Sequence, residues 1–280
     1  WVRPSSLTTK LLRDLVPPSY IQSETFPPTS GFKGKARTPA SWLGVWSPGD
    51  RAARKSRAAI LGGFALTPHH RYMFSGRTMF GGHCTIDGGV SYTLGGDPHT
   101  PALFSDAVLS EADRGWLEKL AAMLASRDKA TLRKVRALEY FYRAWPLEPA
   151  ERFPIHFMAL DALFGQPEDS TKTVIGALLH VLGAHISYDR LRDLMHMRAS
   201  VIHGGSPDIY DSSKYPKYYR DYDSNPIVDL DLLVVASLRK VLFEGALVQH
   251  SDPNAALIAE LKAKGKLSSK PQPPTILDPL

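Results

Sequence analysis

The spacing of apolar and polar positions divides the 280-residue chain into two parts that differ in their periodicity. Residues 1–50 are rich in proline, serine and threonine and keep no regular period. Between residues 72 and 95, two short β-prone runs flank Asp87-Gly88-Gly89, which is typical of a hairpin turn. From about residue 105, apolar positions recur at helical spacing. The pattern predicts an α+β protein, with a β-rich, loop-heavy N-terminal domain over residues 1–104 followed by helices.

The helical part divides at its capping signals. The first helix is expected after Ser110 and Asp113, a loose capping box, and the second over residues 128–145. The expected core stripes of these two helices are Trp116, Leu117, Leu120 and Leu124, and then Leu132, Val135, Leu138, Tyr142 and Trp145. Further helices are expected over 148–165, 170–183, 187–205, 228–249 and 254–265, the 170–183 helix with Ser170 as N-cap. Residues 206–226 predict a long polar loop and 266–280 an irregular tail, so a single all-α bundle is expected over residues 105–265.

Composition narrows the class of protein. The formal net charge of +6 favours phosphate-bearing partners such as nucleic acid, although only weakly. A lone cysteine, Cys84, excludes an internal disulfide framework and fits a cytoplasmic protein best. No window approaches the roughly 20 apolar residues of a membrane span, so no membrane association is expected. Glycine pairs near residues 62, 81, 88 and 95 match no phosphate-binding loop and predict turns.

The stretch MHMRASVIHGG, residues 195–205, carries the chemistry of most interest. Cleavage of an RNA phosphodiester needs a group that handles the 2′-hydroxyl proton and a cation that stabilises charge on the phosphate. A histidine suits the first task and an arginine the second. Arg198 and His203 therefore have the residue types for RNA cleavage without a metal or a cofactor.

Helical geometry separates these two side chains. Five positions along an ideal helix turn by about 500°, which leaves Arg198 and His203 roughly 140° apart around the axis. They meet at one phosphate only if the last turn is distorted near Gly204 or if a second copy of the chain completes the site. His196 and Ser200 lie nearer to the face of His203 and are possible supporting residues. A catalytic site here therefore favours a homodimer.

An Arg-x4-6-His motif at the end of a helix, inside an all-helical bundle, resembles the HEPN superfamily. FMALDALFG, residues 157–165, is similar to the ALE-x-LF helix of the Apea-like HEPN branch, and LRDLMHMRASVIHGG is similar to its L-x-x-x-R-S-x-I-V-H-G segment. The resemblance covers about residues 130–250. Two departures stand out, because Ala199 occupies a position that is often polar in active members, and Asp161 stands where the branch has glutamate.

The resemblance implies a helical bundle that dimerises with the two motifs facing each other. It implies a metal-independent endoribonuclease of toxin or anti-phage defence systems, with Arg198 holding the phosphate and His203 acting as general acid and base. Asp161 either orients Arg198 or is a plain surface charge. Two alternatives stay open: a non-catalytic HEPN module that binds nucleic acid, nucleotide or a protein partner, which Ala199 favours, and a plain helical interaction domain with a coincidental Arg–His pair.

Other residues are candidates for RNA binding or metal binding. The cations Arg51, Arg54, Lys55 and Arg57 either bind an RNA backbone or form a solvated basic face. In the 206–226 stretch, the candidates for an RNA-stacking surface are Lys214, Lys217, Tyr218, Tyr219 and Arg220, although the tyrosines equally suit packing onto the bundle. The set His69, His70, His83 and Cys84 matches no zinc motif, so no metal site is expected. A protein or phage-derived trigger is expected to bind the N-terminal domain.

Overall fold

The computed structural model describes residues 45, 49–67, 74–78, 82–86, 90–94, 101–103, 109–145, 147–166, 169–248, 255–266 and 275–278. Its α-helices are α3 (Asp50–Ala65), α5 (Arg114–Ala125), α6 (Lys129–Ala144), α7 (Pro149–Phe164), α8 (Ser170–Leu182), α9 (Tyr188–Ile202), α10 (Lys214–Tyr222), α11 (Pro226–Leu238) and α12 (Ala255–Ala263). A short 3-10 turn, η2 (Glu111–Asp113), precedes α5, and a π-helical segment, η3 (Arg239–Phe243), continues α11. The strands are β1 (Phe74–Thr78), β2 (Gly82–Ile86), β3 (Val90–Leu94) and β4 (Pro101–Leu103).

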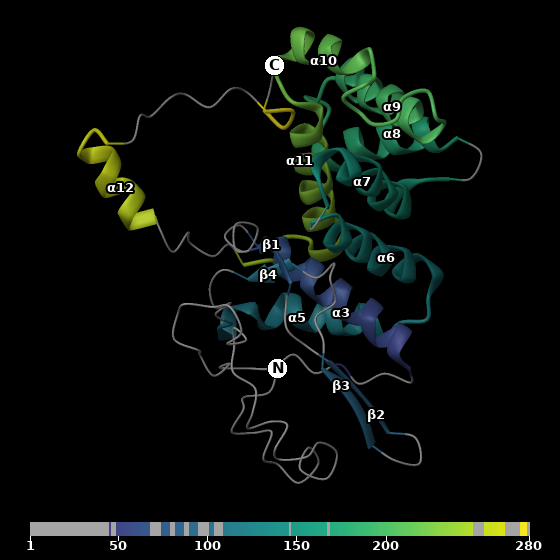
Figure 1. Ribbon diagram of the computed structural model, residues 1–280, viewed down its shortest axis with the longest axis vertical. Coiled ribbons are helices and arrows are strands. Elements are labelled where there is room, and N and C mark those ends of the chain that lie inside the picture. Colours follow the sequence, from purple (N-terminus) through teal and green to yellow (C-terminus); the bar gives the residue numbers. More distant parts are fainter. Residues whose placement is uncertain are drawn as a thin grey trace. The chain divides into compact units, whose positions relative to one another are not determined.

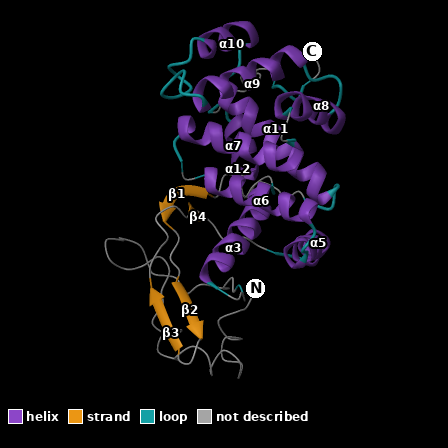
Figure 2. Cartoon of the chain, turned by 90° about the vertical axis from the view of Figure 1, so that its right-hand side faces the viewer, coloured by secondary structure: helices purple, strands orange, loops and turns teal. Residues whose placement is uncertain are grey.

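The chain divides into two compact units. One contains residues 1–57 and 77–102, and the other contains residues 58–76 and 103–280. In the second unit, neighbouring layers run from α6 through α7 and α9 to α10, and α11 packs against α7 (Figures 1 and 2). The predicted boundaries after residues 104 and 265 stay a prediction, because residues 104–108 and 267–274 lie outside the described part.

The prediction of an α+β fold with a β-rich domain over residues 1–104 is wrong. The longest described element of this range is the 16-residue helix α3, and helices dominate the described residues as a whole. The strands are short and form two separate pairs, β1 with β4 and β2 with β3, rather than one sheet. Strands β2 and β3 pair antiparallel, with Gly82 opposite Leu94 and Ile86 opposite Val90.

Tertiary packing explains why α3 is helical despite its glycine pair. Gly62 and Gly63 were expected in a turn but lie inside the helix. A Cβ at Gly62 would come within 2.5 Å of the Leu138 carbonyl oxygen on α6, so glycine permits close contact between the two backbones. The ring of Phe64 then packs edge-on against Trp116 of α5, with 5.1 Å between the ring centroids.

Local signals fix the ends of several helices as the sequence predicts. Ser110 and Asp113 form a capping box, and the Asp113 carboxylate also accepts a 2.9 Å hydrogen bond from the indole of Trp116.

The predicted core stripe of α6 is only partly correct, because Leu132 is exposed and Phe141 is buried in addition to Val135 and Leu138. Residues 214–222, predicted to lie in a loop, form helix α10.

A buried ion pair joins α9 to α11. Nε and a terminal nitrogen of Arg190 donate hydrogen bonds of 2.9 and 2.6 Å to one oxygen of Asp229. The Tyr218 hydroxyl of α10 donates to the same oxygen at 2.5 Å, and Ser224 donates to the other at 2.9 Å. Burial and the neighbouring carboxylate raise the pKa of Tyr218 far above its usual value, so the hydroxyl remains a donor. The network fixes three helices to one another.

We expect Asp229→Ala to lower the free energy of unfolding by about 3–5 kcal/mol, because it leaves the Arg190 charge buried without its partner. Urea unfolding of the wild type and of the variant measures the loss. Arg190→Met combined with Asp229→Leu is expected to regain part of it, since no unpaired charge remains. Asp211→Ala, on an exposed aspartate, is the control, and an equal midpoint for Asp229→Ala and Asp211→Ala would contradict the expectation.

A second buried polar side chain, His156 of α7, lies against the ring of Phe141. Neither ring nitrogen makes a hydrogen bond to a described residue, although Nε2 lies 3.5 Å from a carboxylate oxygen of Asp231. Burial lowers the pKa of His156 to about 4. The charge of Asp231 acts against this lowering, and the charge of Arg152 adds to it. The folded chain therefore keeps His156 neutral at neutral pH.

This lowered pKa predicts acid sensitivity. An unfolded histidine binds its proton near pH 6.5, so the stabilisation is complete above about pH 6.5 and is lost as the pH falls towards about 4. Between about pH 7 and about pH 5, wild type should lose about 2 kcal/mol more unfolding free energy than His156→Phe. Urea unfolding at both pH values measures the difference, and parallel losses in the two proteins would show that His156 does not cause it.

Candidate functional site

Arg198 lies on the side of α9 that faces α7. A terminal nitrogen of its guanidinium forms an ion pair with Asp161, and its guanidinium carbon lies 5.7 Å from the ring centroid of Phe157. Its Nε is buried and makes no hydrogen bond to a described residue. The side chain as a whole is 21% exposed. Asp161 therefore contacts and orients an Arg198 side chain that is only partly exposed.

Two further side chains hold the end of α7 that carries Asp161. Ser170, predicted as an N-cap, instead donates a 2.7 Å hydrogen bond to the second oxygen of the Asp161 carboxylate, and Asp169 is the N-cap of α8. Arg133 of α6 donates to the backbone carbonyls of Asp161, Ala162 and Gly165. Carbonyls at the end of α7 are thus capped by a cation. The sequence did not predict either role. Arg133 lies 28 residues before Asp161, and Ser170 lies on the helix that follows, so no local pattern links them to Asp161.

His203 is the C-cap residue directly after α9 and is exposed. Its amide donates to the Ala199 carbonyl at 3.0 Å, the regular helical bond. Gly204 then takes a φ of +74°, and the amides of Gly204 and Gly205 donate to the carbonyls of Val201 and Ser200 at 3.3 and 2.8 Å. These two bonds form a Schellman motif, in which glycine is favoured because its φ is positive. The two glycines therefore end the helix cleanly at His203.

This regular ending decides between the two ways in which Arg198 and His203 can meet. The helix is undistorted up to the amide of His203, so the angle of roughly 140° between the two side chains is retained. In the described part of the chain, no hydrogen bond links them. The distorted last turn is therefore not observed, and one chain does not bring Arg198 and His203 together.

The predicted supporting residues lie away from Arg198. His196 is exposed, and its backbone carbonyl accepts a 3.3 Å hydrogen bond from Lys214 of α10. Ser200 is half-buried, and its carbonyl accepts the amides of Gly205 and Ser206. Because residues 196, 200 and 203 are spaced by four and three, they form one stripe of α9. This stripe is on the α10 side of the helix, whereas Arg198 is on the α7 side.

The predicted RNA-binding residues occupy two helices. On α10, Lys214, Lys217, Tyr219 and Arg220 are exposed, whereas Tyr218 is 1% exposed and presents no ring for stacking. On α3, the other candidates are the exposed Arg51, Arg54 and Lys55 and the half-buried Arg57. These belong to the other compact unit, and their part in RNA binding stays a prediction.

The described residues contain neither a metal-binding cluster nor a membrane-spanning helix. Within the described residues, no group of three or more histidine, cysteine, aspartate or glutamate side chains is placed to hold a metal ion. The side chains of His69, His70, His83 and Cys84 lie outside that part. Among the helices described, none has the length and apolar character needed to cross a bilayer.

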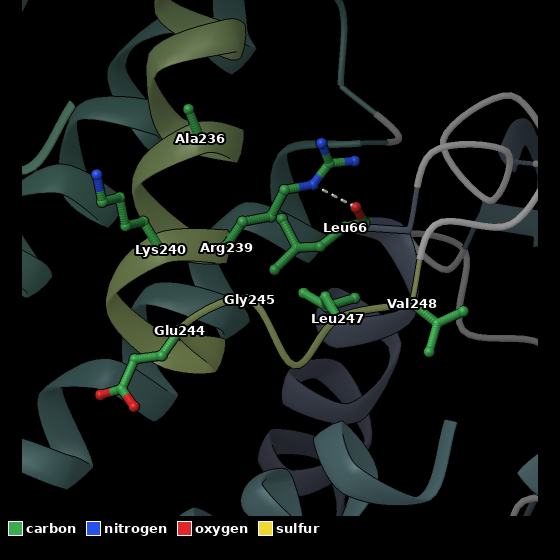
Figure 3. Close-up of a pocket in the computed structure, with 8 residues that line it drawn as sticks. All are labelled: Leu66, Ala236, Arg239, Lys240, Glu244, Gly245, Leu247 and Val248. Atoms are coloured by element: carbon green, nitrogen blue, oxygen red, sulfur yellow. Dashed lines mark hydrogen bonds between the residues drawn. The ribbon is translucent and has the colours of Figure 1, made fainter. Parts of the chain in front are cut away.

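An open hollow lies beside the π-helical segment η3 (Figure 3). It is lined by Leu66, Ala236, Arg239, Lys240, Glu244, Gly245, Leu247 and Val248. Arg239 donates a 2.7 Å hydrogen bond to the Leu66 carbonyl at its edge. The lining contains no histidine and no residue of α7 or α9, so this hollow is separate from the predicted acid–base chemistry.

Comparison of the chain with known proteins found no related protein. No protein-family model matches the chain, and no curated protein or solved structure matches it either.

The glycine at the end of α9 gives a stability test. We expect Gly204→Ala to destabilise the protein by about 1 kcal/mol, because an L-residue is strained at a φ of +74°. Gly176→Ala is the matched control, since Gly176 is exposed within α8 with open space around its Cβ position. There alanine should stabilise by about 0.5–1 kcal/mol. Urea unfolding measures both, and a stabilising effect of Gly204→Ala would contradict the cap geometry.

Proposed function

We propose that this protein is a metal-independent endoribonuclease of the HEPN type that acts as a homodimer, in toxin or anti-phage defence. The supporting observation is the division of α9 into two faces. Arg198 is held at the surface by Asp161, whereas His203 is exposed at the regular end of the same helix. A single phosphate contacts both residue types only when Arg198 of one chain meets His203 of another.

In this proposal, the 2′-hydroxyl of the RNA attacks the adjacent phosphorus. His203 accepts the 2′-hydroxyl proton as the 2′-oxygen bonds to phosphorus, the bond from phosphorus to the 5′-oxygen breaks, and that oxygen takes a proton from the solvent. The products are a 2′,3′-cyclic phosphate and a 5′-hydroxyl. Arg198 stabilises the charge on the phosphate oxygens, and Asp161 and Phe157 keep its guanidinium in one orientation.

Exposed apolar side chains beside Arg198 support the dimer. Met158 of α7 is 38% exposed and lies one turn before Asp161. Ile202 of α9 is 46% exposed and lies one turn after Arg198. Neighbours at these spacings share one helix face, so apolar surface flanks the charged pair on both helices. Such a surface is typical of a contact between protein chains.

The second candidate is a non-catalytic HEPN module that dimerises and binds nucleic acid, nucleotide or a protein partner. The observation in its favour is that Ala199 is exposed beside Arg198, where active members often have a polar residue. In that case the Arg198–Asp161 pair only holds α9 to α7. The two candidates differ in whether RNA is cut and not in the fold.

Cleavage of a labelled single-stranded RNA in the presence of a chelator tests the proposal. Wild type should cut, and Arg198→Ala and His203→Ala should each lower the rate at least about 100-fold. Circular dichroism and gel filtration show whether the variants fold and dimerise. Cutting by both folded variants at the wild-type rate would rule out this site.

Mixing the two inactive variants tests whether the site is shared. In a mixed dimer, the Arg198→Ala chain supplies His203 and the His203→Ala chain supplies Arg198, so one of the two sites is intact. Random exchange makes about half of the dimers mixed, and activity should return to about a quarter of the wild-type value. If the mixture stays as inactive as its components after exchange, each chain carries its own complete site or none.

A further inference from the structure

A small notch lies between α9 and α10, on the opposite side of α9 from Arg198. Its volume is about 70 Å³, and its lining is formed by Asp193, His196, Lys214, Lys217 and Tyr218. It has room for a single small group and not for a nucleotide base with its sugar. Its chemistry therefore concerns a small ion or one phosphate.

The charges in the notch favour an anion. Lys214 and Lys217 are exposed and lie one turn apart on the same side of α10, and the Lys214 ammonium reaches the His196 carbonyl across the notch. The carboxylate of Asp193 already accepts a 2.9 Å hydrogen bond from the Tyr222 hydroxyl. Burial and this carboxylate raise the pKa of Tyr222 above its usual value, so the hydroxyl keeps its proton. Two lysines thus line the notch beside one carboxylate, and that carboxylate already accepts a hydrogen bond.

Tyr218 contributes a wall rather than a donor. Its hydroxyl donates to Asp229 in the buried network, so the ring is fixed and does not turn into the notch. The nearby exposed pairs, Arg192 with Asp189 and Arg220 with Asp221, balance their own charges. Lys214, Lys217 and His196 are therefore the lining residues that remain to meet a ligand.

The position of the notch along α9 connects it with His203. His196, Ser200 and His203 form one stripe, and seven residues of helix separate its ends by about 10 Å. A short stretch of single-stranded RNA spans such a distance. A strand placed with its reactive phosphate at His203 and running along this stripe meets the two lysines next.

We propose that the notch is a phosphate subsite, in which Lys214 and Lys217 bind a backbone phosphate of the single-stranded RNA that is cut at His203. The inference rests on the proposed function for its ligand, but the subsite has its own residues and its own test. Contact at this subsite is electrostatic and independent of base sequence, since lysines bind a phosphate as point charges.

Binding is measured by fluorescence anisotropy of a short 2′-O-methyl RNA, which lacks the attacking hydroxyl and is not cleaved. The full-length chain carries Lys214→Gln with Lys217→Gln, and the matched control carries Lys129→Gln with Lys262→Gln, which removes two other exposed lysines. The notch variant should bind about tenfold more weakly than wild type, and the slope of log affinity against log salt should fall by about 0.7, the value for the loss of one phosphate contact with a single strand. The control should match wild type.

Cleavage of ordinary RNA gives a second, independent readout. If the proposed function holds, the notch variant should raise KM with little change in kcat, because the lysines bind the strand and do not touch the reacting atoms. Lysine-dependent binding by a chain that cuts no RNA would support the subsite and overturn the nuclease. Equal affinity and salt slope in wild type and the notch variant, or no RNA binding at all, would overturn the subsite even if cleavage is intact.

Discussion

The buried contact between Arg190 and Asp229 constrains the rest of the helical unit. Two charges removed from water are stable only when their hydrogen-bonding atoms are satisfied, and here Tyr218 and Ser224 complete the set around the carboxylate. These demands fix the rotation of α9 against α10 and α11. Arg198 lies two turns further along α9, so the same constraint determines that it faces α7.

The helical spacing of apolar residues identified those helices whose buried face and capping residues lie close together in the sequence. Trp116 and Leu120 are buried on the predicted face of α5, and the capping pair Ser110 and Asp113 begins that segment as expected. The failures lie where tertiary contacts override local preference. The glycine pair in α3 suggested a turn, but the approach of the Leu138 backbone makes glycine suitable inside a helix. Likewise, α10 is rich in tyrosine and poor in aliphatic residues, and Tyr218 alone supplies its buried anchor.

The sequence suggested the residues of the candidate site but not the side chains that hold them in place. The sequence suggested that Asp161 either orients Arg198 or is a surface charge, and the contact between them decides this point. The hydrogen bond from Ser170 and the capping by Arg133 each cross from a neighbouring helix to α7, so no spacing rule within one helix reveals them. Ser170 also illustrates how a residue suited to an N-cap is used by a neighbouring helix instead.

The Schellman ending of α9 links the geometry of one chain to its assembly. Had the last turn loosened, His203 would have been free to swing towards Arg198, and a monomer would have sufficed. Because Gly204 and Gly205 close the helix with regular bonds, the histidine stays on the stripe that continues to the notch beside Lys214. One chain thus offers Arg198 on one face of α9 and His203 with Lys214 and Lys217 on the other. In the proposed homodimer, a two-fold pair of chains would place these two halves against each other twice, which is the arrangement that a self-complementary interface provides.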